Sequence, residues 1–235
     1  MLIFRAAFVL CIFVNLTEEI IMSNIFDIFK KLENEKKSAE ILPVTHIIVG
    51  LGNKGKEYEN TRHNIGFCAI DYIAGRCGAS INRAKFDALV GDATIAGKRV
   101  LLIKPQTYMN LSGKAVAPAA AFYKVKPENI IVLSDDVNLD VGRMRVRKNG
   151  SDGGQKGLRS IIEHMGTNEF PRIRIGVGKK PHPDYELADW VLGNFSATDK
   201  AAISELYPTI YEGVEKLLTG DVDGAMQVCN SKATK

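Results

Sequence analysis

The chain has 235 residues, of which 46% are hydrophobic and 25% are charged, and its mean hydropathy is −0.04. Such a composition is typical of a soluble globular chain that buries one substantial core. The four cysteines, Cys11, Cys68, Cys77 and Cys229, lie far apart without CxxC spacing. This pattern suggests neither a zinc ribbon nor a disulfide framework and favours a reducing cytoplasm.

An apolar run, AAFVLCIFV, occupies residues 6–14. It is too short to span a bilayer, which takes about 20 residues. Only Arg5 precedes it and no A-x-A-like cleavage site follows, so we do not expect secretion. Met22 begins an alternative start, and we expect residues 1–21 to be an upstream extension.

The rest of the chain alternates strand and helix patterns. Apolar runs and alternating stretches predict strands at His46–Leu51, Ala88–Ile95, Arg99–Lys104, Asn129–Leu133, Arg143–Arg147 and Ile173–Val177. Helical spacing predicts helices at Ile65–Arg76, Lys114–Tyr123, Gly157–Met165 and Thr198–Leu218. We therefore expect an α/β fold in a single domain at 45–235, a mixed, mainly parallel twisted sheet with helices on both faces. Residues 1–44 are expected to be an N-terminal extension, disordered or in part a mis-assigned start.

Ligands of open α/β sheets gather at the carboxyl ends of the strands. Three loops that follow predicted strands read GNKGKEYENTRHN, PQTYMNLSG and SDDVNLDVG. They hold most of the unusual polar residues of the chain, so we expect the functional site among them.

The first loop contains the pattern G-x-G-x-x-G at Gly50, Gly52 and Gly55, which suggests a dinucleotide site. The context does not fit, because KEYENTRHN has no apolar periodicity that would open a helix there. The acidic residue about 20 positions on, Asp71, lies inside a predicted helix instead of at the end of a second strand. A dehydrogenase is therefore a distant alternative that NAD titration would test.

His63 lies in the same loop, just ahead of a predicted helix. Histidine can take a proton from water and return it, because its unperturbed pKa is near neutrality. A general base needs an orienting carboxylate, and Asp135 or Asp136 is placed to supply one. From these residues alone two simpler interpretations stay open: an ordinary surface histidine, and an Asx turn that ends the strand.

The loop Pro105–Gly113 brings an aromatic side chain, a methionine and an amide together before a helix. Such a group can offer apolar surface to a substrate chain and an amide to a carbonyl or a water. Ser112 is equally consistent with a helix N-cap. The sequence has no G-x-S-x-G, H-E-x-x-H or G-x-x-x-x-G-K-[ST] pattern, which weighs against serine-esterase, zincin and P-loop chemistry.

Positive charge is concentrated between Arg143 and Lys180, where ten Lys or Arg face three acids, a local charge of +7. The whole chain carries +4, so the remainder carries −3. A basic segment on a slightly acidic protein is typical of a surface that binds a phosphate backbone. A solvated face is the alternative interpretation.

Together, the segments GLGNKGKEYENTRHNIGF, KPQTYMNLSGKAV, DDVNLDVGRMRVRK, GSDGGQKGLRSII and FPRIRIGVGK resemble the bacterial-type peptidyl-tRNA hydrolase family in order and spacing. The resemblance covers roughly residues 45–225. It implies a monomeric, cytoplasmic α/β enzyme that cleaves the ester joining a peptide to the 3′ end of tRNA, with peptidyl-tRNA as its partner and with no cofactor, metal or membrane.

The resemblance also implies roles for particular residues. His63 matches the catalytic base, Asp135 its supporting carboxylate, and Asn53 the residue that favours N-blocked substrates. Positions that contact substrate are matched by Tyr58, Tyr108, Met109 and Asn110, and basic residues linked to the tRNA phosphate by Arg147 and Arg174. Both arginines fall inside the basic segment.

The chain departs from the family pattern at three positions. Lys54 stands where the family usually has proline, and Gln155 and Lys156 stand where it often has His-Asn. The loss of that asparagine removes an amide expected to contact substrate, whereas a lysine there could meet a phosphate. A non-catalytic RNA-binding protein on the same fold is the alternative function, and retention of His63, Asp135 and Asn110 weighs against it.

Overall fold

The computed structural model describes residues 42–231. Within them, the chain from Pro43 onward forms one compact unit. The apolar run at residues 6–14 and the alternative start at Met22 lie outside the described residues. The expected boundary between an extension and a domain near residue 45 therefore stays a prediction.

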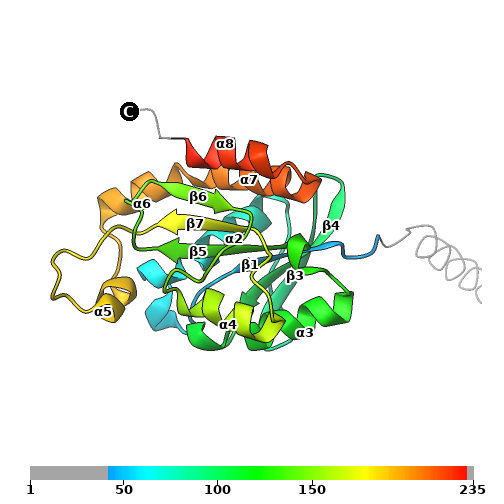
Figure 1. Ribbon diagram of the computed structural model, residues 1–235, viewed down its shortest axis with the longest axis horizontal. Coiled ribbons are helices and arrows are strands. Elements are labelled where there is room, and N and C mark those ends of the chain that lie inside the picture. The colour runs from blue at the N-terminus through cyan, green and yellow to red at the C-terminus, as the bar shows by residue number, and fades with distance from the viewer. Residues whose placement is uncertain (1–41, 232–235) are drawn as a thin grey trace, which may run out of the picture. The chain divides into compact units, whose positions relative to one another are not determined.

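The described residues form a seven-stranded sheet with the strand order β2-β3-β4-β1-β5-β7-β6 (Figure 1). Its strands are β1 (His46–Gly50), β2 (Arg83–Lys85), β3 (Ala88–Ile95), β4 (Lys98–Pro105), β5 (Ile130–Asp136), β6 (Met144–Arg147) and β7 (Arg172–Gly176). The four central strands, β4, β1, β5 and β7, are parallel, while β3 and β6 pair antiparallel with their neighbours. The expected mixed, mainly parallel sheet is thus confirmed.

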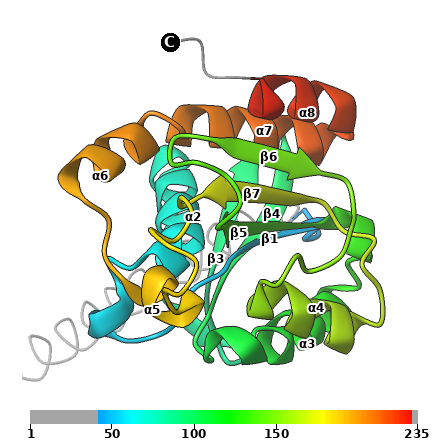
Figure 2. The ribbon, with the colours of Figure 1, turned by 60° about the vertical axis from the view of Figure 1, so that its left-hand side comes forward.

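Helices cover both faces of the sheet (Figures 1 and 2). One face carries α2 (Ile65–Arg76), α7 (Tyr207–Thr219) and α8 (Val222–Asn230), and the other carries α3 (Gly113–Tyr123) and α4 (Lys156–Met165). Successive strand residues alternate between the two cores: Ile48 packs toward α2, whereas Ile47 and Val49 pack toward α3. Two shorter helices, α5 (Leu187–Leu192) and α6 (Ala197–Ser204), follow β7.

The predicted helix at Thr198–Leu218 is wrong in one respect, because it is two helices, α6 and α7. Pro208 lies in the first turn of α7. A proline has no N–H with which to continue a helix, yet its fixed φ suits a first turn, so the helix stops before it and restarts. Strand β5 also runs beyond the predicted Leu133, so that Asp135 and Asp136 are its last two residues.

Gly66, in the first turn of α2, allows this helix to contact the backbone directly at the end of β1 and in the middle of β5. A Cβ built on Gly66 would lie 2.5 Å from the carbonyl oxygens of both Leu51 and Leu133. Gly50 likewise lies against Gly66, where an added Cβ would be 2.4 Å from the carbonyl oxygen. Gly50 of the glycine motif therefore serves helix packing, and α2 opens only at Ile65, after the short helical turn Arg62–Asn64.

At the outer edge of β6, one side chain from α8 binds the backbone of Val146. The backbone N–H of Val146 donates to Oδ1 of Asn230 at 2.6 Å, and Nδ2 of Asn230 donates to the carbonyl oxygen of Val146 at 3.3 Å. One amide therefore satisfies both outward backbone groups of Val146, as a neighbouring strand would.

Candidate active site

A pocket of about 400 Å³ lies at the carboxyl edge of β5, where the loops after β1, β4 and β6 meet. Most of the side chains predicted from the sequence line it: Asn53, His63, Tyr108, Met109, Asn110, Asp135 and Arg174. Gln155 and Lys156, two of the three departures from the family pattern, line it as well. The structure thus brings together residues that are up to 121 positions apart in the chain, from Asn53 to Arg174.

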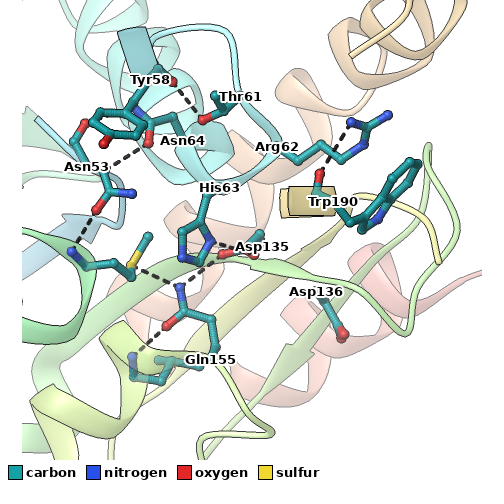
Figure 3. Close-up of polar contacts among 12 residues, drawn as sticks. Asn53, Tyr58, Thr61, Arg62, His63, Asn64, Asp135, Asp136, Gln155 and Trp190 are labelled. Atoms are coloured by element: carbon teal, nitrogen blue, oxygen red, sulfur yellow. Dashed lines mark hydrogen bonds and ion pairs between the residues drawn. The ribbon is translucent and has the colours of Figure 1, made fainter. Parts of the chain in front are cut away.

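His63 and Asp135 form the central pair of this pocket (Figure 3). His63 lies in the helical turn Arg62–Asn64, and its Nδ1 is 2.9 Å from Oδ2 of Asp135. The side chains are 12% and 3% exposed, so Asp135 is shielded while the imidazole still reaches the pocket. Since an ionised carboxylate only accepts hydrogen bonds, Nδ1 carries the hydrogen and Nε2 is the ring nitrogen left to accept one.

Asp136 has a different set of partners. Its Oδ1 accepts the backbone N–H of Asn138 at 2.9 Å, an Asx turn that ends β5. Its Oδ2 lies 3.0 Å from Nε of Arg174. The simpler interpretation left open for the two aspartates therefore applies to Asp136, whereas Asp135 binds the histidine.

The amide of Asn53 has a defined orientation. Its Oδ1 accepts the backbone N–H of Met109 at 2.8 Å, so its NH₂ group is the end left for the pocket. The backbone of Asn53 is held in turn by Asn64, which accepts the Asn53 N–H at 2.8 Å and donates to its carbonyl oxygen at 2.9 Å. This arrangement presents a hydrogen-bond donor at a fixed place beside His63.

Two predicted residues do not line the pocket. Tyr58 lies in the short helical turn Lys56–Tyr58, and its carbonyl oxygen accepts Oγ1 of Thr61 at 2.8 Å. Arg147 is exposed near the end of β6. Roles for these two residues therefore stay predictions.

The basic segment found in the sequence becomes one face of the β6–β7 pair. Arg145 and Arg147 on β6 pair with Arg174 and Arg172 on β7, and the intervening residues of both strands point into the opposite core. All four arginines therefore share the α4 side of the sheet. Arg174 is the one that reaches the pocket.

Arg172 was missed by the sequence reasoning because it looked like one more surface cation. It is 1% exposed and donates to backbone carbonyl oxygens, including those of Gly150, Ser151 and Asn168 at 2.5, 3.1 and 2.8 Å. Burial lowers the pKa of its guanidinium to about 10. Arg172 thereby fixes the start of the glycine-rich loop whose Gly153 lines the pocket.

Helix α5, which no sequence pattern predicted, forms an apolar wall of the pocket through Leu187, Val191 and Leu192. It is attached to the turn that carries His63 by Arg62, whose guanidinium carbon lies 3.6 Å from the Trp190 ring centroid (Figure 3). Nη1 of Arg62 also donates to the Trp190 carbonyl oxygen at 3.4 Å. The six residues of this helix are too few to show a helical period in the sequence.

Among residues 42–231, no cluster of three or more His, Cys, Asp or Glu side chains is arranged to hold a metal ion. Within the same residues, no helix has the length and apolar character needed to cross a membrane.

Residues 47–235 match the family model described as peptidyl-tRNA hydrolase. The chain is 48% identical to the peptidyl-tRNA hydrolase of Clostridium botulinum (strain Alaska E43 / Type E3) over 80% of this chain and 98% of that protein. It is equally identical, 48%, to that of Caldicellulosiruptor bescii over 79% and 96% of the two chains. The crystal structure of peptidyl-tRNA hydrolase from Acinetobacter baumannii is similar with a TM-score of 0.75 at 34% identity, covering 82% of this chain and 98% of that one.

These matches span the sheet, the pocket and the glycine-rich loop. The chain therefore belongs to the peptidyl-tRNA hydrolase family.

Proposed function

We propose that this chain hydrolyses the ester bond between the peptide and the tRNA of peptidyl-tRNA, with His63 as the general base. The reaction follows from membership of the peptidyl-tRNA hydrolase family. The observation that carries the assignment of the base is the 2.9 Å contact between Nδ1 of His63 and the shielded carboxylate of Asp135.

In this scheme Asp135 accepts the hydrogen on Nδ1, and Nε2 of His63 removes a proton from a water molecule. The water oxygen attacks the ester carbonyl carbon. Collapse of the tetrahedral intermediate breaks the bond to the ribose oxygen, which takes the proton back from the imidazolium. Asp135 stabilises the imidazolium between these two proton transfers.

Charge develops on the carbonyl oxygen during the attack and needs a hydrogen-bond donor. The NH₂ group of Asn53 is fixed beside His63 by the bond from Met109 and can donate to the substrate. Asn110 is exposed at the pocket and offers a second amide. These two amides hold the peptide or the developing oxyanion.

The peptide lies against the apolar part of the pocket, where Tyr108 is 54% exposed and Leu187 is 44% exposed. Exposed apolar side chains at a pocket rim are the surface that a peptide would cover. Tyr58, in the same loop as Asn53, is a further substrate contact in this proposal.

The tRNA lies on the arginine face of β6 and β7. Arg174 reaches the pocket, Arg147 extends the basic surface along β6, and Lys156 adds a charge at the start of α4. Guanidinium groups bind phosphate oxygens in bidentate fashion, whereas a lysine acts as a point charge.

We further infer that the enzyme works as a monomer in the cytoplasm. All the proposed catalytic groups come from one chain. The described cysteines, Cys68, Cys77 and Cys229, are free thiols, as expected in a reducing compartment.

The test is cleavage of N-acetylated aminoacyl-tRNA or peptidyl-tRNA by the full chain and by His63→Ala. We expect cleavage by the parent chain, loss of turnover in the variant, and retained tRNA binding. A parent chain that binds tRNA without cleaving it would support the non-catalytic RNA-binding alternative instead. The scheme uses protein groups alone, so EDTA should leave the rate unchanged, and a strict metal requirement would overturn it.

A further inference from the structure

Gln155 lies directly beside the catalytic pair, at the N-cap of α4 (Figure 3). Its side chain is buried, and the residue is 8% exposed. We propose that Gln155 is a positioning residue, which holds the second carboxylate oxygen of Asp135 and so orients His63 through it. The proposal rests on the role of His63 as the base.

The contacts of Gln155 determine which way its amide points. Its Oε1 lies 2.8 Å from the backbone nitrogen of Leu158, which can only donate. Its Nε2 lies 2.9 Å from Oδ1 of Asp135, which can only accept when ionised. The reverse orientation would set two donors against each other at one end and two acceptors at the other, so the observed one is required.

Both oxygens of Asp135 are thereby occupied, Oδ2 by His63 and Oδ1 by Gln155. The residue is only 4% exposed, so water has little access to either oxygen. An uncompensated buried carboxylate would take up a proton or rotate, and a hydrogen bond to its charged form opposes both. Because the amide is neutral, it stabilises the carboxylate without competing with His63 for its negative charge.

Gln155 also connects the pair to the substrate loop. Its Nε2 lies 3.1 Å from Sδ of Met109, whose backbone nitrogen donates to Oδ1 of Asn53. One buried amide therefore contacts the carboxylate behind the base and the residue that orients the pocket amide. A shift of Gln155 would displace both.

A purely structural role is the competing explanation, since Gln155 caps α4. The substitution Gln155→Glu separates the two roles. A glutamate keeps an acceptor for the Leu158 N–H, and its charge suits a helix N-terminus. It replaces the donor facing Asp135 with a second carboxylate, so the positioning bond is lost while the helix cap is kept, and a second charge is buried beside Asp135. Gln155→Leu removes both roles.

The experiment measures kcat and KM for peptidyl-tRNA against pH, with melting temperature, for the parent chain, both variants and Asp221→Ala. Asp221 caps the distant α8 by accepting the Gly224 N–H at 2.9 Å, so its variant reports the effect of losing a cap alone. Asp221→Ala should lower the melting temperature without changing kcat.

We expect Gln155→Glu to lose about tenfold or more in kcat, with a smaller change in KM. Its melting temperature should also fall, because a second carboxylate is buried beside Asp135, so the pH profile is the measurement that separates it from Gln155→Leu. The added negative charge favours the imidazolium form of the base, so the acidic limb of kcat/KM should move to higher pH. Gln155→Leu should lose kcat and melting temperature together.

Full activity of Gln155→Glu with an unmoved acidic limb would overturn the positioning role and leave capping as the function of Gln155. This outcome is distinct from failure of the proposed base. In that case His63→Ala itself would keep turnover, whatever the Gln155 variants did.

Discussion

Asp135 and Asp136 are consecutive in β5, yet each binds a different cationic or basic side chain: Asp135 contacts His63 at 2.9 Å, and Asp136 contacts Arg174 at 3.0 Å. Both are buried, at 4% and 5% exposure. One strand end therefore supports both the proposed base and a cation proposed to meet tRNA.

The same substitution at these two positions should have different consequences. Asp135→Asn should lower kcat by about 10²- to 10⁴-fold, because an amide no longer stabilises the imidazolium and favours the wrong tautomer. Asp136→Asn should mainly raise KM, because Arg174 loses its partner. Steady-state kinetics on peptidyl-tRNA measures kcat and KM for both variants. Equal losses of kcat would contradict the separate roles of Asp135 and Asp136.

Arg174→Gln should weaken tRNA binding about tenfold, because a hydrogen-bonded charge on phosphate is lost. The slope of log K against log salt should become shallower by about one. A filter-binding or fluorescence titration at several salt concentrations gives both quantities. Arg83→Gln, on the far edge strand β2, is the matched control and should leave the slope unchanged.

Gly66→Ala should destabilise the protein by about 1–3 kcal/mol, because its Cβ would meet two carbonyl oxygens and displace α2. The displacement also moves His63 relative to Asp135, so kcat should fall. Gly75, in the same helix, has nothing within 4 Å of an added Cβ. Gly75→Ala should therefore raise the unfolding free energy by up to about 1 kcal/mol. Denaturant unfolding measures both, and equal effects would refute the close packing at Gly66.

Trp190→Leu should raise KM, because α5 would lose two contacts that hold it in place. One is the stacking of Arg62 on the Trp190 ring, and the other is the hydrogen bond that Nε1 of Trp190 donates to the Gly178 carbonyl oxygen at 2.8 Å. Phe122, which is 61% exposed on α3, provides a control. Phe122→Leu removes an aromatic ring remote from the pocket and should leave KM unchanged. An unaltered KM in Trp190→Leu would show that α5 does not depend on this contact.

Stability should fall as the pH drops from about 6.5 toward 4. Burial, followed by the charge of Lys98, lowers the pKa of His46 from 6.5 to about 4. The unfolded chain then binds a proton between those pH values that the folded chain does not, so the free energy of unfolding decreases across this window, by about 1–3 kcal/mol at most. His46→Gln should flatten the dependence, and an unchanged slope in urea unfolding at pH 4–7 would exclude His46 as its source.

The central sheet and the loops that build the pocket could be predicted from the sequence. Apolar runs and the turn residues that bound them are local patterns that can be recognised without knowledge of the packing. Asp135 and His63 lie 72 residues apart, and their contact depends on α2 resting against β1 and β5. Such a contact is a property of packing and leaves no local pattern, so the residues alone left His63 among the ordinary histidines.

Gln155 is a residue whose role could not be predicted from the sequence. In the sequence it stood out only as a departure from a family pattern, because a glutamine before a helix has many possible uses. Its importance comes from two partners on either side of one amide, Leu158 and Asp135, and only the structure specifies them. Helix α5 was missed for a related reason, since its six residues are too few to show a period.

The bonds of the Asn230 amide to β6 have a consequence for solubility. An exposed strand edge can recruit the edge of another sheet and start aggregation. Asn230 already occupies both outward groups of Val146, and the flanking Arg145 and Arg147 would set like charges against a second copy. The strand that carries the proposed nucleic-acid surface is therefore also protected against self-association. The enzyme can keep β6 at the edge of its sheet without pairing with a second copy.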